Sequence, residues 1–196
     1  ENSKMKKLIH KFLVIFILFG PTAGYGDEND SASQGENGLE AFRQGDLMLA
    51  MELLGKSAAK GYAPAQSTLA FILDKADEDE SAFKLYELAA RQGYAEAELG
   101  LGLMYAKGEG TQKDPLIAGQ WIEKSALQRH RPAMRAFAAA LEFGNLGFDR
   151  NAQQALHWYQ QCSESGDTVC TRRLAEAYEQ GGLGLAPDMN RAKELR

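Results

Sequence analysis

The sequence predicts an all-α protein, a right-handed α-solenoid built from antiparallel helix pairs. Two observations predict this class. An alanine recurs every 32 to 37 residues, and the residues that follow it repeat in type from copy to copy. A period in this range is typical of repeat arrays, in which each unit buries its apolar face against its neighbours. The alanines are Ala50, Ala82, Ala118, Ala155 and Ala192.

Each of these alanines is expected to open the first helix of a repeat. Bulky residues stand three and four positions on, as Trp121 and Ile122 do after Ala118. Residues with this spacing share one face of a helix. Eleven positions on, most copies have a glycine, which suits the left-handed conformation just past a helix end. The residues in this column are Gly61, Gly93, Arg129 and Gly166.

A second helix is expected to follow each first one. Its first small residue is Ala65, Ala97, Ala133 or Cys170, and a bulky residue comes four positions later. A second column of C-terminal residues contains Ala76, Gly108, Gly144 and Gly181. After Gly108, a turn leads to Asp114, whose side chain can cap the next helix. The alternative, an ordinary helical bundle with coincidental spacing, does not explain so many columns in register over about 150 residues.

The third copy resembles a Sel1-like repeat, a relative of the tetratricopeptide repeat. It reads Ala-Glu-Leu-Gly-Leu-Gly-Leu-Met-Tyr-Ala-Lys-Gly-Glu-Gly from Ala97, followed by Asp114, Ala118 and Trp121. The resemblance extends from residue 38 to residue 196 and implies a solenoid that serves other proteins as an adaptor or scaffold. The expected repeats are 38–61, 62–93, 94–129, 130–166 and 167–196, with a shortened leading helix in the first.

Residues 1–26 read as a secretory signal peptide, with Met5 as the natural start. Basic residues precede a short apolar core at 12–19, and small residues follow it. An uncleaved membrane anchor is the alternative, although the core is shorter than the span of about 20 residues that a bilayer needs. No cysteine lies in this segment, so we do not expect a lipoprotein. We expect a periplasmic or secreted protein of a Gram-negative-type bacterium.

The polar segment 27–37 has too few apolar residues to bury and is expected to be a flexible acidic leader. Removal of residues 1–26 lowers the formal net charge from −5 to −8. An acidic protein without a basic stripe is a poor candidate for binding nucleic acid or anionic lipid. We therefore expect a protein or peptide partner, an envelope protein above all, and no membrane span after cleavage.

The two cysteines, Cys162 and Cys170, occupy small-residue columns of the two helices of one repeat. In another copy these columns hold Ala89 and Ala97, which are expected to face each other across the turn. Such a pair can meet the Cα separation of about 5.5–6 Å that a disulfide prefers. A redox-active pair and a metal site are the alternatives, but the spacing is longer than Cys-x-x-Cys and no second ligand pair is evident. The same placement resembles the cysteine-rich branch of the Sel1-like family.

Few residues point to catalysis, and no cofactor or metal is expected. Two Ser-x-x-Lys matches begin at Ser57 and Ser81, but the Ser-Asp-Asn and Lys-Thr-Gly elements of penicillin-recognising enzymes are absent. Ser57 falls in a small packing column, and Ser81 precedes Ala82 at a good capping position. The three histidines, His10, His130 and His157, are scattered. Weak penicillin-binding or β-lactamase-like activity is therefore only an alternative, and it rests on the resemblance.

The expected function is that of a non-catalytic scaffold or adaptor. A structural role in an envelope machine for motility, secretion or polysaccharide export is the other alternative. Side chains that vary between copies on the second helices are expected to face the partner. These candidate partner-binding residues are Gln66, Thr68, Glu98, Met134, Thr171 and Arg173.

Overall fold

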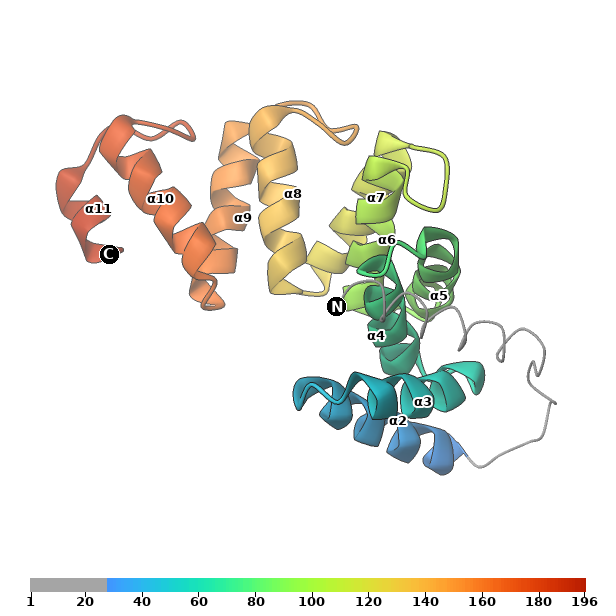
Figure 1. Cartoon of the computed structure of the whole chain (residues 1–196). Coiled ribbons are helices and arrows are strands. Elements are labelled where there is room, and N and C mark those ends of the chain that lie inside the picture. Colours follow the sequence, from blue (N-terminus) through green and yellow to red (C-terminus); the bar gives the residue numbers. More distant parts are fainter. Residues whose placement is uncertain (1–27) are drawn as a thin grey trace. The chain divides into compact units, whose positions relative to one another are not determined.

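The structure is a computed structural model that describes residues 28–196 (Figure 1). The described residues form ten α-helices, α2 to α11, and no strand, which confirms the all-α class. Within them, no helix combines the length and the apolar character that crossing a membrane requires. The predicted signal peptide, residues 1–26 with Met5 as the start, lies outside the described residues.

The chain divides into two compact units, and the boundary falls inside α6. Unit 1 extends to Gly100 and also includes residues 109–112. Its helices are α2 (Glu28–Arg43), α3 (Leu47–Ala59), α4 (Ala63–Asp74), α5 (Asp79–Arg91) and the first part of α6 (Ala95–Lys107). In this unit each helix packs on the next one from α2 to α5, as stacked helix pairs require.

Unit 2 contains residues 101–108 and 113–196. Its helices are the rest of α6, α7 (Pro115–Leu127), α8 (Arg131–Phe143), α9 (Ala152–Glu164), α10 (Thr168–Gln180) and α11 (Met189–Glu194). From α7 to α11 each helix again packs on the next. The helix α8 therefore lies between α7, the first helix of its own repeat, and α9, the first helix of the following repeat.

The five repeating alanines occupy one structural position. Each is the fourth residue of its helix, not the first, and each is fully buried. Because alanine is small, the adjoining helix can approach the backbone closely at this position. Gly102 in α6 shows how tight the packing is: a Cβ atom added there would lie 3.0 Å from the carbonyl oxygen of Ala118 in α7. The predicted packing role of the alanine column is confirmed, with the helix start moved three residues upstream.

The two columns of helix-ending residues also have the predicted conformation. Gly61, Gly93 and Gly166 have positive φ angles, and Arg129 joins them with φ of 62°. In the second column, Gly108, Gly144 and Gly181 are left-handed, whereas Ala76 is not and its neighbour Asp77 has φ of 62° instead. A side chain in this region costs about 1 kcal/mol or more. Arg129 and Asp77 thus end their helices at a cost in backbone energy, and Leu146 and Leu183, in the loops after Gly144 and Gly181, have positive φ angles as well.

The prediction of a flexible leader is wrong for residues 28–37, because they form the first part of α2. The small residues of this segment explain the ordering, because they let α2 lie directly on its neighbours. A Cβ atom at Gly35 would overlap the ring of Tyr62, and one at Gly38 would overlap Leu54. The leading helix of the first repeat is therefore 16 residues long and is not shortened.

One of the two predicted caps is present. Asp114 caps α7, since its Oδ1 accepts hydrogen bonds from the backbone N–H groups of Leu116 and Ile117 at 3.0 Å. Ser81 is not a cap, because α5 begins at Asp79 and its N-cap residue is Glu78. The acidic residues Asp79 and Glu80 form the first turn of α5, so this helix starts one turn earlier than a cap at Ser81 would place it.

Candidate partner-binding surfaces

The predicted binding residues on the second helices are mostly buried. Gln66, Thr68, Glu98 and Met134 all lie in the interior, and Glu98 and Met134 are fully buried. A buried side chain offers no surface to a partner, so the expectation of an open face is wrong at these four positions.

Gln66 shows why this column is buried. Its Nε2 donates a hydrogen bond to the carbonyl oxygen of Ala58, at the end of α3, at 3.1 Å. Its Oε1 accepts one from Nε2 of Gln92, the residue that ends α5, at 2.7 Å. The side chain thus joins the first helix of its own repeat to the first helix of the next repeat. At Gln66 this column therefore serves the contact between neighbouring repeats.

The other two predicted residues are partly exposed, and both are engaged. Thr171 Oγ1 donates to the carbonyl oxygen of Asp167 and lies 2.7 Å from Ser163 Oγ. Arg173 Nε donates to both carboxylate oxygens of Glu142, each at 3.2 Å. Binding of a partner by Thr171 or Arg173 stays a prediction, but Arg173 is already committed to a contact within unit 2.

A polar groove with an aromatic floor is lined by helices α7, α8 and α9 of unit 2. Its volume is about 400 Å³. Glu123 comes from α7, Phe137 from α8, and Gln153, Gln154, His157 and Trp158 from α9. We call it the α7–α9 groove. The Phe137 ring supports the Trp158 ring edge-to-face, with centroids 5.1 Å apart. The amide groups of Gln153 and Gln154 are exposed at its rim.

The repeat columns do not predict the α7–α9 groove, because Trp158, three positions after Ala155, falls in the bulky packing column. Trp158 does pack on Phe137, but it is only half buried and also lines the groove. The sequence does contain one indication of this groove, which is the position of its polar residues. They flank the buried Ala155 on helix faces that the repeat columns do not use, and they are Gln153, Gln154 and His157. Polar residues between packing columns mark the exposed side of a repeat helix.

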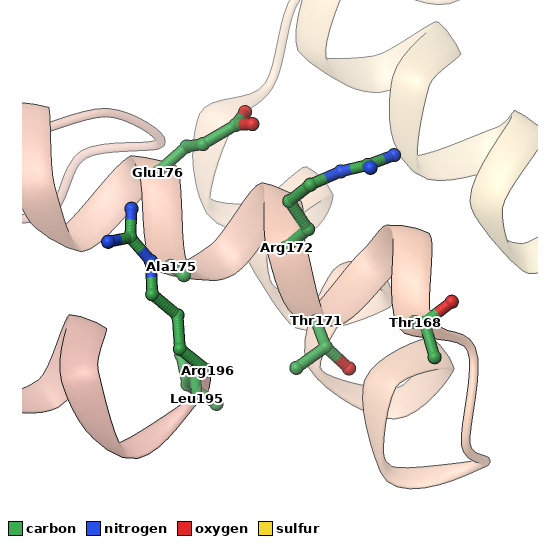
Figure 2. Close-up of a pocket in the computed structure, with 7 residues that line it drawn as sticks. All are labelled: Thr168, Thr171, Arg172, Ala175, Glu176, Leu195 and Arg196. Atoms are coloured by element: carbon green, nitrogen blue, oxygen red, sulfur yellow. The ribbon is translucent and has the colours of Figure 1, made fainter.

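A second groove lies at the end of unit 2, between α10 and the short helix α11. Figure 2 shows the residues that line it: Thr168, Thr171, Arg172, Ala175 and Glu176 along α10, with Leu195 and Arg196 just after α11. We call it the terminal groove. Its volume is ≈ 420 Å³. Thr171 is the one predicted binding residue that lines either groove.

The predicted disulfide is present. Cys162 and Cys170 are bonded, their Cα atoms are 5.9 Å apart, and both side chains are fully buried. The Asp167 carboxylate lies close to both sulfur atoms, so the three groups are near enough to share a metal ion. However, the sulfurs are bonded to each other, and Asp167 is occupied by Arg135 at 2.8 Å and by the N–H groups of Val169 and Cys170. The cluster therefore ties α9 to α10 as a structural element.

The serines of the two Ser-x-x-Lys matches lie in ordinary structural positions of helices α3 and α5. Ser57 is fully buried, and its hydroxyl donates to the carbonyl oxygen of Ser31 in α2 at 2.6 Å. A nucleophile must instead face a substrate and a base. Ser81 lies in the first turn of α5 and lines neither groove.

The family follows from the repeat itself. The model of the Sel1 repeat matches residues 35–62, 73–94, 95–130, 132–167 and 169–195. The chain belongs to the Sel1 repeat family. The five matches agree in number with the five repeats expected from the alanine spacing.

Two curated relatives are similar in sequence to this chain. One is the ERAD-associated E3 ubiquitin-protein ligase component HRD3A of Arabidopsis thaliana, 33% identical over 128 residues, 57% of this chain and 19% of the relative. The other is the chitin synthase regulator SKT5 of Saccharomyces cerevisiae, 24% identical over 180 residues, 86% of this chain and 25% of the relative. The chain thus spans a quarter or less of these relatives.

A solved Sel1 repeat protein from Oxalobacter formigenes has the same fold. It superposes with a TM-score of 0.68 at 31% identity, over 82% of this chain and 67% of the other. The described helices of this chain therefore form a Sel1 repeat solenoid fold, as the sequence predicts.

Proposed function

We propose that this Sel1 repeat protein is an exported, non-catalytic scaffold that binds another protein through the α7–α9 groove. The observation that carries the proposal is the composition of this groove. An aromatic floor of Phe137 and Trp158 is bordered by the exposed amides of Gln153 and Gln154. Aromatic side chains dominate the binding energy of protein interfaces, and a polar rim usually surrounds them.

The chemistry of the α7–α9 groove fits a peptide segment or loop of a partner. The half-exposed Trp158 ring can cover an apolar side chain. The glutamine amides can both donate to and accept from a peptide backbone. Glu123 and His157 complete the lining, and the Glu123 carboxylate favours a partner segment that carries a hydrogen-bond donor or a positive charge there.

The names of the relatives support a role that depends on other proteins. One relative is a component of a ubiquitin ligase and the other is a regulator of chitin synthase. These activities belong to much longer proteins and identify no partner for this chain. What the comparison supports is the class of function, a scaffold or regulator that acts through association.

Export is part of the proposal and rests on residues 1–26. A basic start, an apolar core and small residues favour a signal peptide. The Cys162–Cys170 disulfide fits an oxidising compartment such as the periplasm. Intact-mass measurement of the mature protein from a periplasmic fraction tests it, with cleavage expected between Ala23 and Asp27. A cytoplasmic protein that retains Met5 would contradict export.

Comparative affinity capture tests the binding surface. The wild-type protein, Gln154→Arg and the matched control Gln180→Arg are tagged, expressed at native level and recovered after cross-linking, and their partners are identified by mass spectrometry. Gln180 is exposed at the end of α10 and lines neither groove. A partner recovered with wild type and Gln180→Arg, and reduced about tenfold with Gln154→Arg, supports the proposal. Equal recovery with all three would contradict it.

Recovery of a stable complex of fixed composition would indicate that the scaffold is a structural component of an envelope machine. Catalysis is tested separately, because the purified protein is expected to leave nitrocefin unhydrolysed. Hydrolysis that disappears in Ser81→Ala would overturn the non-catalytic part of the proposal.

A further inference from the structure

The turn between α7 and α8 departs from the repeat pattern at three positions, which are Leu127, Arg129 and Arg131. We call these three residues the α7–α8 turn surface. Arg129 stands where the other copies of this turn have a glycine, and Arg131 stands where they have alanine or threonine. The equivalent residues are Gly61, Gly93 and Gly166 for Arg129, Ala63, Ala95 and Thr168 for Arg131, and Ala59, Arg91 and Glu164 for Leu127.

The fold itself gives no reason for an arginine at position 129. The φ angle of Arg129 is 62°, in the left-handed region that favours glycine, so this residue carries backbone strain that glycine would relieve. Its side chain is exposed and, among residues 28–196, forms no hydrogen bond or ion pair. Strain that no polar contact of the side chain offsets points to a role for Arg129 outside the fold.

Arg131 adds a second guanidinium group at the same end of unit 2. Its Nη1 lies 3.8 Å from the position that a Cβ atom at Gly166 would occupy, so the side chain extends toward the turn between α9 and α10 (Figure 1). The carboxylate of that turn, Asp167, is engaged by Arg135 at 2.8 Å. Within the described part of the chain, the exposed Arg131 forms no ion pair, and the exposed Glu164 at the end of α9 does not pair with it. The guanidinium group of Arg131 is therefore open to an anion from outside.

The charge around this turn is opposite in sign to the charge of the whole chain. Residues 124–141 include one lysine and three arginines and no acidic residue, whereas the chain has a formal net charge of −5. Leu127, which is 65% exposed, adds an apolar contact to this basic surface. Such a surface suits a short acidic peptide segment that also carries an apolar side chain. A long polyanion, such as a nucleic acid or an anionic membrane, would also meet the acidic charge on the rest of the chain.

We propose that the α7–α8 turn surface binds an acidic segment of a partner protein. Carboxylates of that segment pair with the guanidinium groups of Arg129 and Arg131, and a neighbouring apolar side chain covers Leu127. A guanidinium group presents two parallel N–H donors to a carboxylate, so arginine suits this contact better than lysine. The surface shares no residue with the α7–α9 groove, so binding at the two places can fail separately.

Peptide display tests the chemistry of the ligand. A library of random dodecamer peptides is selected against the purified protein, with counter-selection against the double variant Arg129→Gly/Arg131→Ala. This variant restores residues that other copies have at both positions, so it is expected to fold, and urea unfolding checks its stability. The selected peptides should be rich in aspartate and glutamate and carry a bulky apolar residue. Selection of no binder, or of peptides without acidic enrichment, would overturn the proposal.

Fluorescence anisotropy with one selected peptide tests the two arginines. Its affinity is expected to fall about threefold in Arg129→Gly and about tenfold in the double variant. Because Arg129→Gly relieves backbone strain, a loss of affinity in this variant does not come from a less stable fold. Arg129→Lys should retain only part of the affinity, since lysine keeps the charge but not the paired donors. Unchanged affinity in the double variant would contradict the proposal.

Arg150→Ala is the matched control, because it removes the same charge from the other end of α8. The backbone nitrogen of Arg150 lies 3.1 Å from the position of a Cβ atom at Gly144, the residue that ends α8. This control should bind the peptide as wild type does. An equal loss in Arg150→Ala would show that the charge of the whole unit attracts the peptide, and it would contradict a specific surface.

Two further probes separate a protein ligand from other sources of negative charge. The wild-type protein is expected to bind neither vesicles of phosphatidylglycerol and phosphatidylcholine nor a single-stranded thymidine oligonucleotide at physiological salt. Binding of either probe that disappears in Arg129→Gly/Arg131→Ala would contradict the proposal, because it would assign the α7–α8 turn surface to phosphate groups.

Discussion

Arg173 of α10 holds the carboxylate of Glu142 in α8 from one side, with Nε donating to both oxygens at 3.2 Å and Nη2 also in contact. From the other side, the Tyr159 hydroxyl of α9 donates to Glu142 Oε2 at 2.9 Å. Three helices from two consecutive repeats therefore meet at one buried carboxylate. Burial, and then this hydrogen bond, raise the pKa of the Tyr159 hydroxyl above its usual value.

Arg173→Met should destabilise the protein by about 2–3 kcal/mol, because it leaves the buried Glu142 carboxylate without its cation. Urea unfolding followed by circular dichroism measures the change. The double variant Glu142→Gln/Arg173→Met should recover part of the loss, since a neutral amide can still accept from Tyr159. A single variant as stable as wild type would show that the contact contributes nothing.

Replacement of both cysteines by alanine, the residue in the equivalent columns of the α5–α6 repeat, should lower stability by about 2.5 kcal/mol. The closed loop is short, with a sequence separation of 8, so the entropic gain is at the low end for a disulfide. Urea unfolding of wild type in dithiothreitol should give nearly the same value. A loss below about 1 kcal/mol in both experiments would contradict the role assigned to the bond.

Arg129→Gly should stabilise the protein by about 1 kcal/mol, because φ at this position is 62° and glycine adopts it without strain. The matched variant Gly93→Ala should lose about 1 kcal/mol. A Cβ atom at Gly93 meets nothing within 4 Å, so backbone strain alone accounts for the loss. Thermal unfolding of the two variants should shift the midpoint in opposite directions. Shifts in the same direction would contradict the assignment of backbone strain to Arg129.

Gly119→Ala in α7 should destabilise the protein by about 2 kcal/mol, although alanine favours helix by about 1 kcal/mol over glycine. The added Cβ atom would lie 2.1 Å from the carbonyl oxygen of Leu146, in the loop between α8 and α9. Backbone atoms cannot move away as easily as a flexible side chain. Stabilisation by this substitution, measured by urea unfolding, would contradict the close approach of this loop to α7.

Tyr86→Phe should reduce the loss of stability at high pH. Burial raises the pKa of the Tyr86 hydroxyl in the folded state above its usual value of 10.0. The folded state therefore keeps a proton that the unfolded chain releases, so the contribution of Tyr86 to stability is constant below pH about 10 and falls as the pH rises further, by up to about 1.4 kcal/mol per unit. Urea unfolding between pH 8 and 11 should show a shallower decline in the variant. Parallel curves would contradict the shifted pKa.

The sequence predicted the packing columns because packing is periodic. The buried alanines, the left-handed Arg129 and the Cys162–Cys170 pair all follow from residues that recur at one interval. The binding surface could not be predicted in this way. Gln66 and Met134 vary between copies but are buried in the interior, whereas Gln154 and Trp158 line a groove that depends on three helices.

The leader was mispredicted for a related reason. Few apolar residues predict disorder when burial of side chains is the only source of stability. In α2 the small residues Gly35 and Gly38 instead allow the backbone to approach Tyr62 and Leu54. Composition does not report this kind of packing, because it depends on the shape of the neighbouring helices.

The central claim is that a protein partner occupies the α7–α9 groove, and site-specific photo-crosslinking in living cells tests it most directly. A benzophenone amino acid is placed at Gln154, and the same residue at Gln180 serves as the control. We expect a discrete cross-linked protein from position 154 that is absent from position 180 and is suppressed by Gln153→Arg in the same chain. Cross-linking from position 180 alone, or identical products from both positions, would contradict it.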